Sequence, residues 1–158
     1  MVDEEQPERS VAADGKLGSL VIAAPPEQIM QTIADFAAYP EWVSSIAETE
    51  VLEVGADGLP ARVRFVLDAE VVSDEYVLAY SWAEDGRSVE WRLESSRLQS
   101  SQVGSYSLVP VEDGTRVEYR ISVTTLMPLL GRLRPRVERR IVGWALNGLR
   151  HYVEGRDQ

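Results

Sequence analysis

The sequence predicts an α+β fold in which a curved antiparallel sheet of about seven strands wraps around one long C-terminal helix. The first observation is an alternation of residue types that runs from Val63 to Val123. Aromatic and branched residues fall on one face of each segment, and charged residues such as Arg62 and Glu75 fall on the other. Alternation with period two is typical of an antiparallel sheet with one wet and one dry face. The second observation is that only the last ~25–30 residues carry a long helical pattern able to cover the dry face.

Length and composition exclude several classes of protein. A chain of 158 residues with 44% hydrophobic residues suits one soluble domain, which we place at residues 16–156. No apolar run is long enough for a membrane span, and the acidic start at Met1 predicts a cytoplasmic protein. The absence of cysteine excludes disulfides and thiolate metal sites, and we expect no metal and no cofactor. The net charge of −10 argues against nucleic-acid binding.

The elements before the sheet follow from local signals. Residues 1–15 are acidic and without periodicity, which predicts a disordered tail. A first strand is expected from Leu17 to Ala23, with Leu17, Ser19 and Val21 on one face. Proline and glutamate at Pro25-Pro26-Glu27 suit the first turn of a helix, and a second short helix is expected at about Glu41 to Ile46. Both short helices thus lie between the first and second strands.

Turn signals divide the remaining chain into strands and a final helix. Glycine-containing turns stand at 55–60, 84–86 and 112–114, and a serine-rich connection runs from 95 to 102. Met127-Pro128 marks a boundary, after which apolar residues recur at intervals of three and four to about Glu154. This spacing predicts one long amphipathic helix.

Three local motifs resemble one known superfamily. Ala24-Pro25-Pro26-Glu27-Gln28-Ile29 resembles its entry to the first helix, and Asp35-Phe36-Ala37-Ala38-Tyr39-Pro40-Glu41-Trp42 resembles its turn between the short helices. Gly104 to Pro110, followed by Gly114 to Val117, resembles its last hairpin. On these residues the chain is similar to the START-like, birch-pollen-allergen-like (SRPBCC) superfamily, in particular to its polyketide cyclase/dehydrase and coenzyme Q-binding protein-like group. The resemblance covers roughly residues 17–155.

The resemblance implies a helix-grip fold with a hydrophobic tunnel between sheet and helix. It does not specify chemistry, because members of the superfamily include lipid carriers, cyclases, hormone receptors and chaperone regulators. We predict that large apolar side chains of the sheet and the last helix form the tunnel wall and bind the ligand. A solid core would produce the same alternation. The predicted wall residues are Phe65, Tyr76, Tyr80, Trp82, Trp91, Tyr106, Tyr119, Val137, Ile141 and Trp144.

Two residues are candidates for acid–base chemistry. Asp74 falls in register with Tyr76, so its carboxylate could face inward and serve as a general base, although acids at strand starts are more often solvated. His151 is the only histidine and lies near the end of the last helix, where its charge would also favour the helix terminus. Neither residue belongs to a recognisable catalytic motif.

Arginines crowd the first half of the last helix. Arg132, Arg136, Arg139 and Arg140 share one side of it and could form an anion-binding rim or touch a membrane surface. The alternative is a solvated charged face in an acidic protein.

These observations favour binding or carriage of a hydrophobic small molecule or lipid over two alternatives. One alternative is a polyketide cyclase or aromatase, and the other is a protein-interaction module without a small ligand. The oligomeric state, the ligand and the pathway stay open at the level of sequence.

Overall fold

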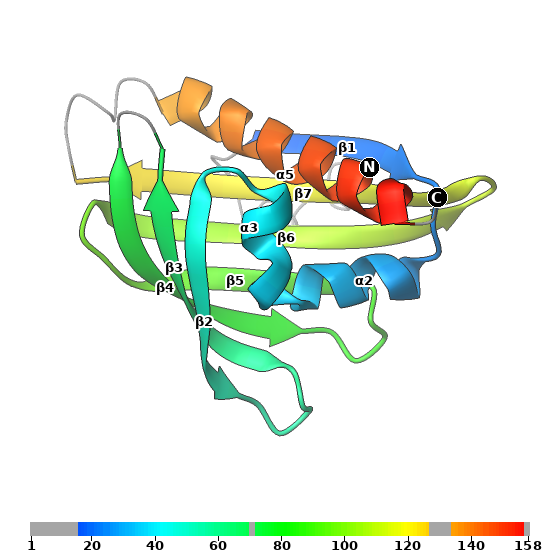
Figure 1. The fold of residues 1–158 in the computed structure, drawn as a ribbon, viewed down its shortest axis with the longest axis horizontal. Helices are drawn as coiled ribbons and strands as arrows, with labels where there is room; N and C mark the ends of the chain where they lie inside the picture. Colours follow the sequence, from blue (N-terminus) through cyan, green and yellow to red (C-terminus); the bar gives the residue numbers. More distant parts are fainter. Residues whose placement is uncertain (1–15, 70–71, 127–133, 157–158) are drawn as a thin grey trace, which may run out of the picture.

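The computed structural model describes residues 16–69, 72–126 and 134–156 and confirms the predicted architecture. Seven strands and one long helix follow one another with two short helices after the first strand (Figure 1). The elements are β1 (Lys16–Ile22), α2 (Pro26–Ala34), η2 (Phe36–Ala38), α3 (Tyr39–Trp42), β2 (Ile46–Val54), β3 (Pro60–Asp68), β4 (Ser73–Trp82), β5 (Ser88–Ser96), β6 (Gln99–Val111), β7 (Gly114–Thr125) and α5 (Arg134–Arg156).

The strands form one antiparallel sheet in the order β1-β7-β6-β5-β4-β3-β2. Consecutive strands pair as hairpins from β2 to β7, and β1 returns to the outer side of β7. The two edges are therefore β1 and β2. The β2 edge is irregular, because its pairing with β3 shifts register at three points between Ile46 and Val54.

The helix α5 crosses the concave face of the sheet and packs mainly on β1 and β7 (Figure 1). Its residues Val142, Leu146, Leu149 and Val153 are buried against this side of the sheet, as the periodicity predicts. Carboxylates of α5 bind the backbone at two distant points. Glu138 accepts a hydrogen bond from the N–H of Val123 at 2.8 Å, and Glu154 accepts one from the N–H of Ala23 at 2.9 Å.

The second short helix differs from the prediction at both ends. It runs from Tyr39 to Trp42 rather than from Glu41 to Ile46. Pro40 occupies its first turn, where a missing N–H costs nothing, so the helix starts two residues earlier. Ile46 instead begins β2 and pairs with Leu67 of β3.

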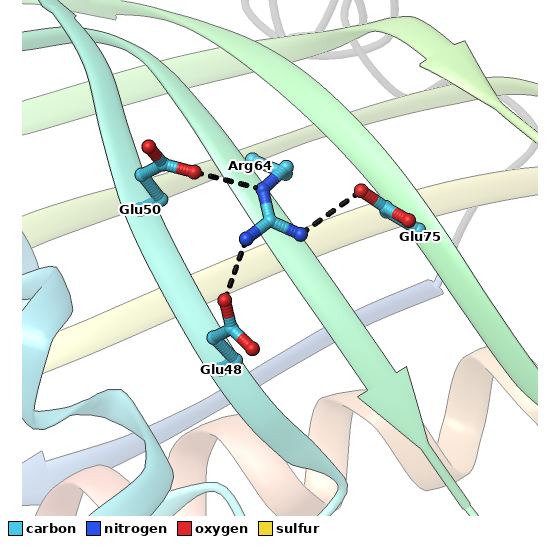
Figure 2. Close-up of polar contacts among 4 residues, drawn as sticks. All are labelled: Glu48, Glu50, Arg64 and Glu75. Carbon is cyan, nitrogen blue, oxygen red and sulfur yellow. Dashed lines mark hydrogen bonds and ion pairs between the residues drawn. The ribbon is translucent and has the colours of Figure 1, made fainter.

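The outer face of the sheet carries paired charges. Arg64 of β3 donates hydrogen bonds to Glu50 at 3.0 Å, to Glu48 at 2.6 Å and to Glu75 at 2.9 Å (Figure 2). Glu48 and Glu50 belong to β2 and Glu75 to β4, so one guanidinium links three strands. This arrangement leaves the opposite face of the same strands for apolar residues, as the alternation predicts.

Some predictions fall outside the described residues. These are the tail at residues 1–15, the boundary at Met127-Pro128 and the residue Arg132. Within the described ranges, no helix combines the length and the apolar character needed to cross a bilayer.

Candidate ligand-binding cavity

A cavity of about 610 Å³ lies between the sheet and α5. Its wall is formed by inward-facing residues of β3 to β7 together with residues of α3 and α5. The cavity exists because α5 rests on β1 and β7, at one side of the curved sheet, while the aromatic strands β3 to β6 lie further from it. A volume of this size is within the range of sites that enclose small organic ligands.

The short helix α3 closes the other side of the cavity against α5. Gly148 of α5 allows this approach, because a Cβ atom there would lie 2.3 Å from the carbonyl oxygen of Trp42. Trp42 is buried and its ring stacks on Tyr152 of α5, with ring centroids 6.4 Å apart. Its neighbour Tyr39 donates a hydrogen bond to the carbonyl of Ile33 at 2.6 Å, which ties α3 back to α2. The turn Tyr39-Pro40-Glu41-Trp42 thus contributes Tyr39 and Trp42 to the cavity wall.

The aromatic wall continues across adjacent strands. Ring centroids of Tyr80 and Trp91 are 5.7 Å apart, and those of Trp91 and Tyr119 are also 5.7 Å apart. Tyr106 and Tyr119 approach to 4.8 Å. Gly104 of β6 provides the space for the indole of Trp91, since a Cβ atom there would lie 2.3 Å from that ring. These contacts, at favourable distances for aromatic pairs, hold the rings to the sheet and to one another rather than to α5.

The tyrosine hydroxyls form a neutral polar group inside this apolar wall. Burial, and then the proximity of the other phenols, raises the pKa of Tyr80 and Tyr119 well above the usual value of a phenol. Burial likewise raises the pKa of Tyr76 and Tyr106. Among the described residues, none hydrogen-bonds to the hydroxyl of any of these four tyrosines. The hydroxyls therefore stay protonated and available as donors to a ligand.

Most other polar lining residues gather at one end of the cavity. Strand register places this end where β4 begins, β5 ends, β6 begins and β7 ends. The residues at this end are Asp74, Gln99, Gln102, Thr124, Thr125, Arg136 and Arg140. The cavity therefore has an aromatic interior and a polar end.

Asp74 is buried rather than solvated, with a relative exposure of 2%. Its carboxylate accepts hydrogen bonds from Ser96 Oγ at 2.6 Å, from the N–H of Arg97 at 3.1 Å and from Gln99 Nε2 at 3.0 Å. These donors belong to the connection between β5 and β6. The geometry thus gives Asp74 a structural role, because its three hydrogen bonds hold the β5–β6 connection against the start of β4.

The structure brings nine of the ten predicted wall residues to the cavity, and their role in binding stays a prediction. Trp82 is the exception. Its ring stacks on Tyr80 at 5.7 Å and its Nε1 donates to the carbonyl of Pro60 at 2.7 Å, which places it beside the wall and not in it. His151 is exposed on α5 and does not line the cavity.

The predicted arginine rim divides into two groups. Arg136 and Arg140 are exposed and also line the cavity, so they stand at its mouth. Arg139 is exposed and does not line it.

Sequence reasoning missed several lining residues. Tyr39 lies in the motif from Asp35 to Trp42 that resembles the superfamily, so this motif could have identified it as a lining residue. Gln99 and Gln102 lie in what reads as a serine-rich connection, and only the pairing of β6 with β7 brings them to the cavity. Glu138 reads as one acid among arginines, but it is 1% exposed and holds α5 to β7. Its burial depends on long-range packing that has no local signal.

Comparison with known proteins finds one family whose model matches this chain and several solved structures with a similar fold. The model of a family described as polyketide cyclase/dehydrase and lipid transport matches residues 18–154. A START superfamily protein from Mycobacterium smegmatis superposes with a TM-score of 0.82 at 22% identity, covering 89% of this chain and 97% of that one. The Zhui aromatase/cyclase from Streptomyces sp. R1128 gives a TM-score of 0.79 at 17% identity, with 91% and 95% covered. At such identities the two structures show a shared fold alone. No curated protein gives a significant match.

Proposed function

Because the chain belongs to the polyketide cyclase/dehydrase and lipid transport family, we propose that it binds a hydrophobic small molecule or lipid in the cavity beneath α5. The observation that carries the proposal is the 610 Å³ cavity with its mostly apolar, aromatic wall. Burial of apolar ligand surface contributes about 25 cal/mol per Å² before the cost of association, so a largely enclosed ligand has a sufficient driving force.

The tyrosine hydroxyls orient the ligand in this proposal. Tyr76, Tyr80, Tyr106 and Tyr119 are neutral donors that lack partners among the described residues. A ligand with carbonyl or ether oxygens along its length would satisfy them, and a purely hydrocarbon ligand would not. The site therefore favours an oxygenated apolar molecule.

Mass spectrometry of the natively purified protein tests this function. We expect an organic extract to contain a small apolar molecule in a fixed ratio to the protein. Ile141→Trp places a large ring at a lining position of α5 and should abolish retention, because it fills the space that the ligand needs. Arg150→Trp is the matched control, since Arg150 is exposed on the same helix and does not line the cavity. Equal retention by wild type and Ile141→Trp would refute the proposed site.

A second candidate is a cyclase that folds a reactive chain in the cavity. The observation in its favour is the cluster of four neutral phenols, which could stabilise developing negative charge on carbonyl oxygens. Asp74 is the only carboxylate among the described lining residues, and its three hydrogen bonds favour binding over catalysis. Incubation with a poly-β-ketone thioester separates the two functions. A cyclase releases cyclised product and loses turnover in Asp74→Asn, and a carrier returns the thioester with only its spontaneous products.

A protein-interaction module without a small ligand is the least favoured function. Such a module has no need of an internal cavity, and a filled core would be more stable. The mass spectrometry of the natively purified protein also tests this function, because a module of this kind would carry no small molecule through purification.

A further inference from the structure

The charged groups of the cavity lining are unevenly distributed. Among the described lining residues, the only charged side chains are Asp74, Arg136 and Arg140. All three lie at the polar end, and the aromatic interior contains no charge. An amphipathic cavity of this kind suits a ligand with one polar head and an apolar body.

The two arginines stand side by side at the mouth. They are four residues apart on α5, so one face of the helix carries both. Each is exposed and lines the cavity, so each residue stands at the boundary between solvent and interior. Neither forms an ion pair in the part of the chain that the structure describes, whereas Arg62 and Arg64 of the sheet are paired with glutamates.

Among the described residues, none of the nearby carboxylates forms an ion pair with Arg136 or Arg140. Both oxygens of Asp74 accept hydrogen bonds from the β5–β6 connection. Glu138, on the same helix turn as the arginines, is buried and accepts the N–H of Val123. Glu41 lines a surface groove that Arg140 also lines, yet it forms no ion pair with it. The mouth therefore keeps two positive charges in a protein whose net charge is −10.

We propose that the ligand carries one anionic group, a carboxylate or a phosphate, which Arg136 and Arg140 bind at the mouth while the apolar body fills the aromatic interior. The inference rests on the proposed function, because it names the class of ligand for the same cavity. Guanidinium groups bind both anions with paired, charge-assisted hydrogen bonds. The overall negative charge of the protein repels an anion from most of its surface. The two arginines offset this repulsion at the mouth of the cavity.

A series of ligands with one chain and different heads tests the inference. Decanoate, decyl phosphate and the neutral decanol are titrated into the protein, and the fluorescence of the lining tryptophans Trp42, Trp91 and Trp144 reports binding. At low salt we expect the two anions to bind about tenfold to a hundredfold more tightly than decanol. The double variant Arg136→Gln/Arg140→Gln should lose this preference and keep its affinity for decanol. The control Arg139→Gln/Arg150→Gln removes the same charge from exposed positions outside the lining and should keep the preference.

The outcomes separate this inference from the proposed function. If decanol binds and the anions gain nothing over it, the anionic head is refuted and the apolar cavity stands. Equal loss of all three ligands in the double variant would also overturn the inference, because it would indicate a structural role for the arginines. If none of the three ligands binds to wild type, the inference is refuted, whereas the proposed function is decided separately by the mass spectrometry of the natively purified protein. A preference for decyl phosphate alone identifies a phosphate as the head, and equal preference for both anions identifies charge as the criterion.

Discussion

The two faces of the sheet are built from the same strands, but they differ in whether their polar side chains find partners within the protein. On the outer face, Arg64 satisfies three glutamates, and Arg62 pairs with Glu94 at 2.8 Å. On the concave face, the hydroxyls of Tyr76, Tyr80, Tyr106 and Tyr119 have no partner among the described residues. The paired charges of the outer face are thus satisfied within the protein, and the four phenols of the inner face are left for another molecule.

This difference separates stability from binding. The outer pairs are exposed, and exposed ion pairs contribute little to stability. The inner rings supply buried apolar area, which dominates the free energy of folding, while their hydroxyls contribute nothing to it without a partner.

Alkaline pH should have the largest effect, because it acts on five phenols together. Burial raises the pKa of Tyr39 as it does for the four tyrosines of the wall. The tyrosines of the unfolded chain ionise near pH 10, before those of the folded protein, so the unfolded state loses protons first. The contribution of these five phenols to the free energy of unfolding should therefore be constant below about pH 9 and should fall as pH rises above about 10. Phenolate absorbance and thermal unfolding measured at the same pH values check this. Ionisation of these five phenols near pH 10 with the fold intact would contradict it.

Phe36→Ala should cost about 3–5 kcal/mol of stability, as expected for a buried phenylalanine. Phe36 is 1% exposed and its ring contacts Tyr39 and Tyr80, with centroids 4.8 and 4.9 Å apart. Its removal leaves a void behind the aromatic wall. Urea denaturation measures the loss, and Phe36→Leu, which keeps most of the volume, should lose much less. Similar losses in both variants would indicate that volume at this position is unimportant.

Arg64→Ala should cause only a small loss of stability that depends on salt. The glutamates around it are 52–60% exposed, so solvent screens the three ion pairs. Thermal unfolding should show a slightly lower midpoint at low ionic strength and no difference at about 0.5 M salt, where screening is strong. A loss of stability in Arg64→Ala as large as that in Phe36→Ala would show that the ion pairs of the outer face contribute as much to stability as the buried rings do.

Tyr119→Phe should leave the stability of the ligand-free protein unchanged or slightly raised. The substitution removes a hydroxyl that faces the cavity and has no protein partner among the described residues, and it keeps the ring that contacts Trp91 and Tyr106. The same variant should bind an oxygenated apolar ligand more weakly than wild type does. Urea denaturation and a ligand titration measure the two effects. A destabilised protein with unchanged binding would show that the hydroxyl serves the fold.

Periodicity in the sequence predicted the fold because alternation and helical spacing are local. Tyr80, Trp91 and Tyr119 could be assigned to one face from their register alone, and the structure places all three in the cavity wall. The same reasoning included Trp82, although its position beyond the cavity depends on a hydrogen bond to Pro60, which lies far from it in sequence. Long-range packing likewise decides the burial of Glu138, whereas the register of Asp74 with Tyr76 already indicated that its carboxylate could face inward.

The irregular pairing of β2 has a consequence for assembly. An open sheet has an edge whose unpaired backbone groups can recruit a second chain and start aggregation. Three register shifts interrupt this edge, so an incoming strand would find no continuous ladder to extend. Glu48, Glu50 and Glu53 add repulsion between identical edges, which counts because Val51 and Val54 beside them are exposed. The protein thus combines an internal cavity with a β2 edge that resists fibre formation.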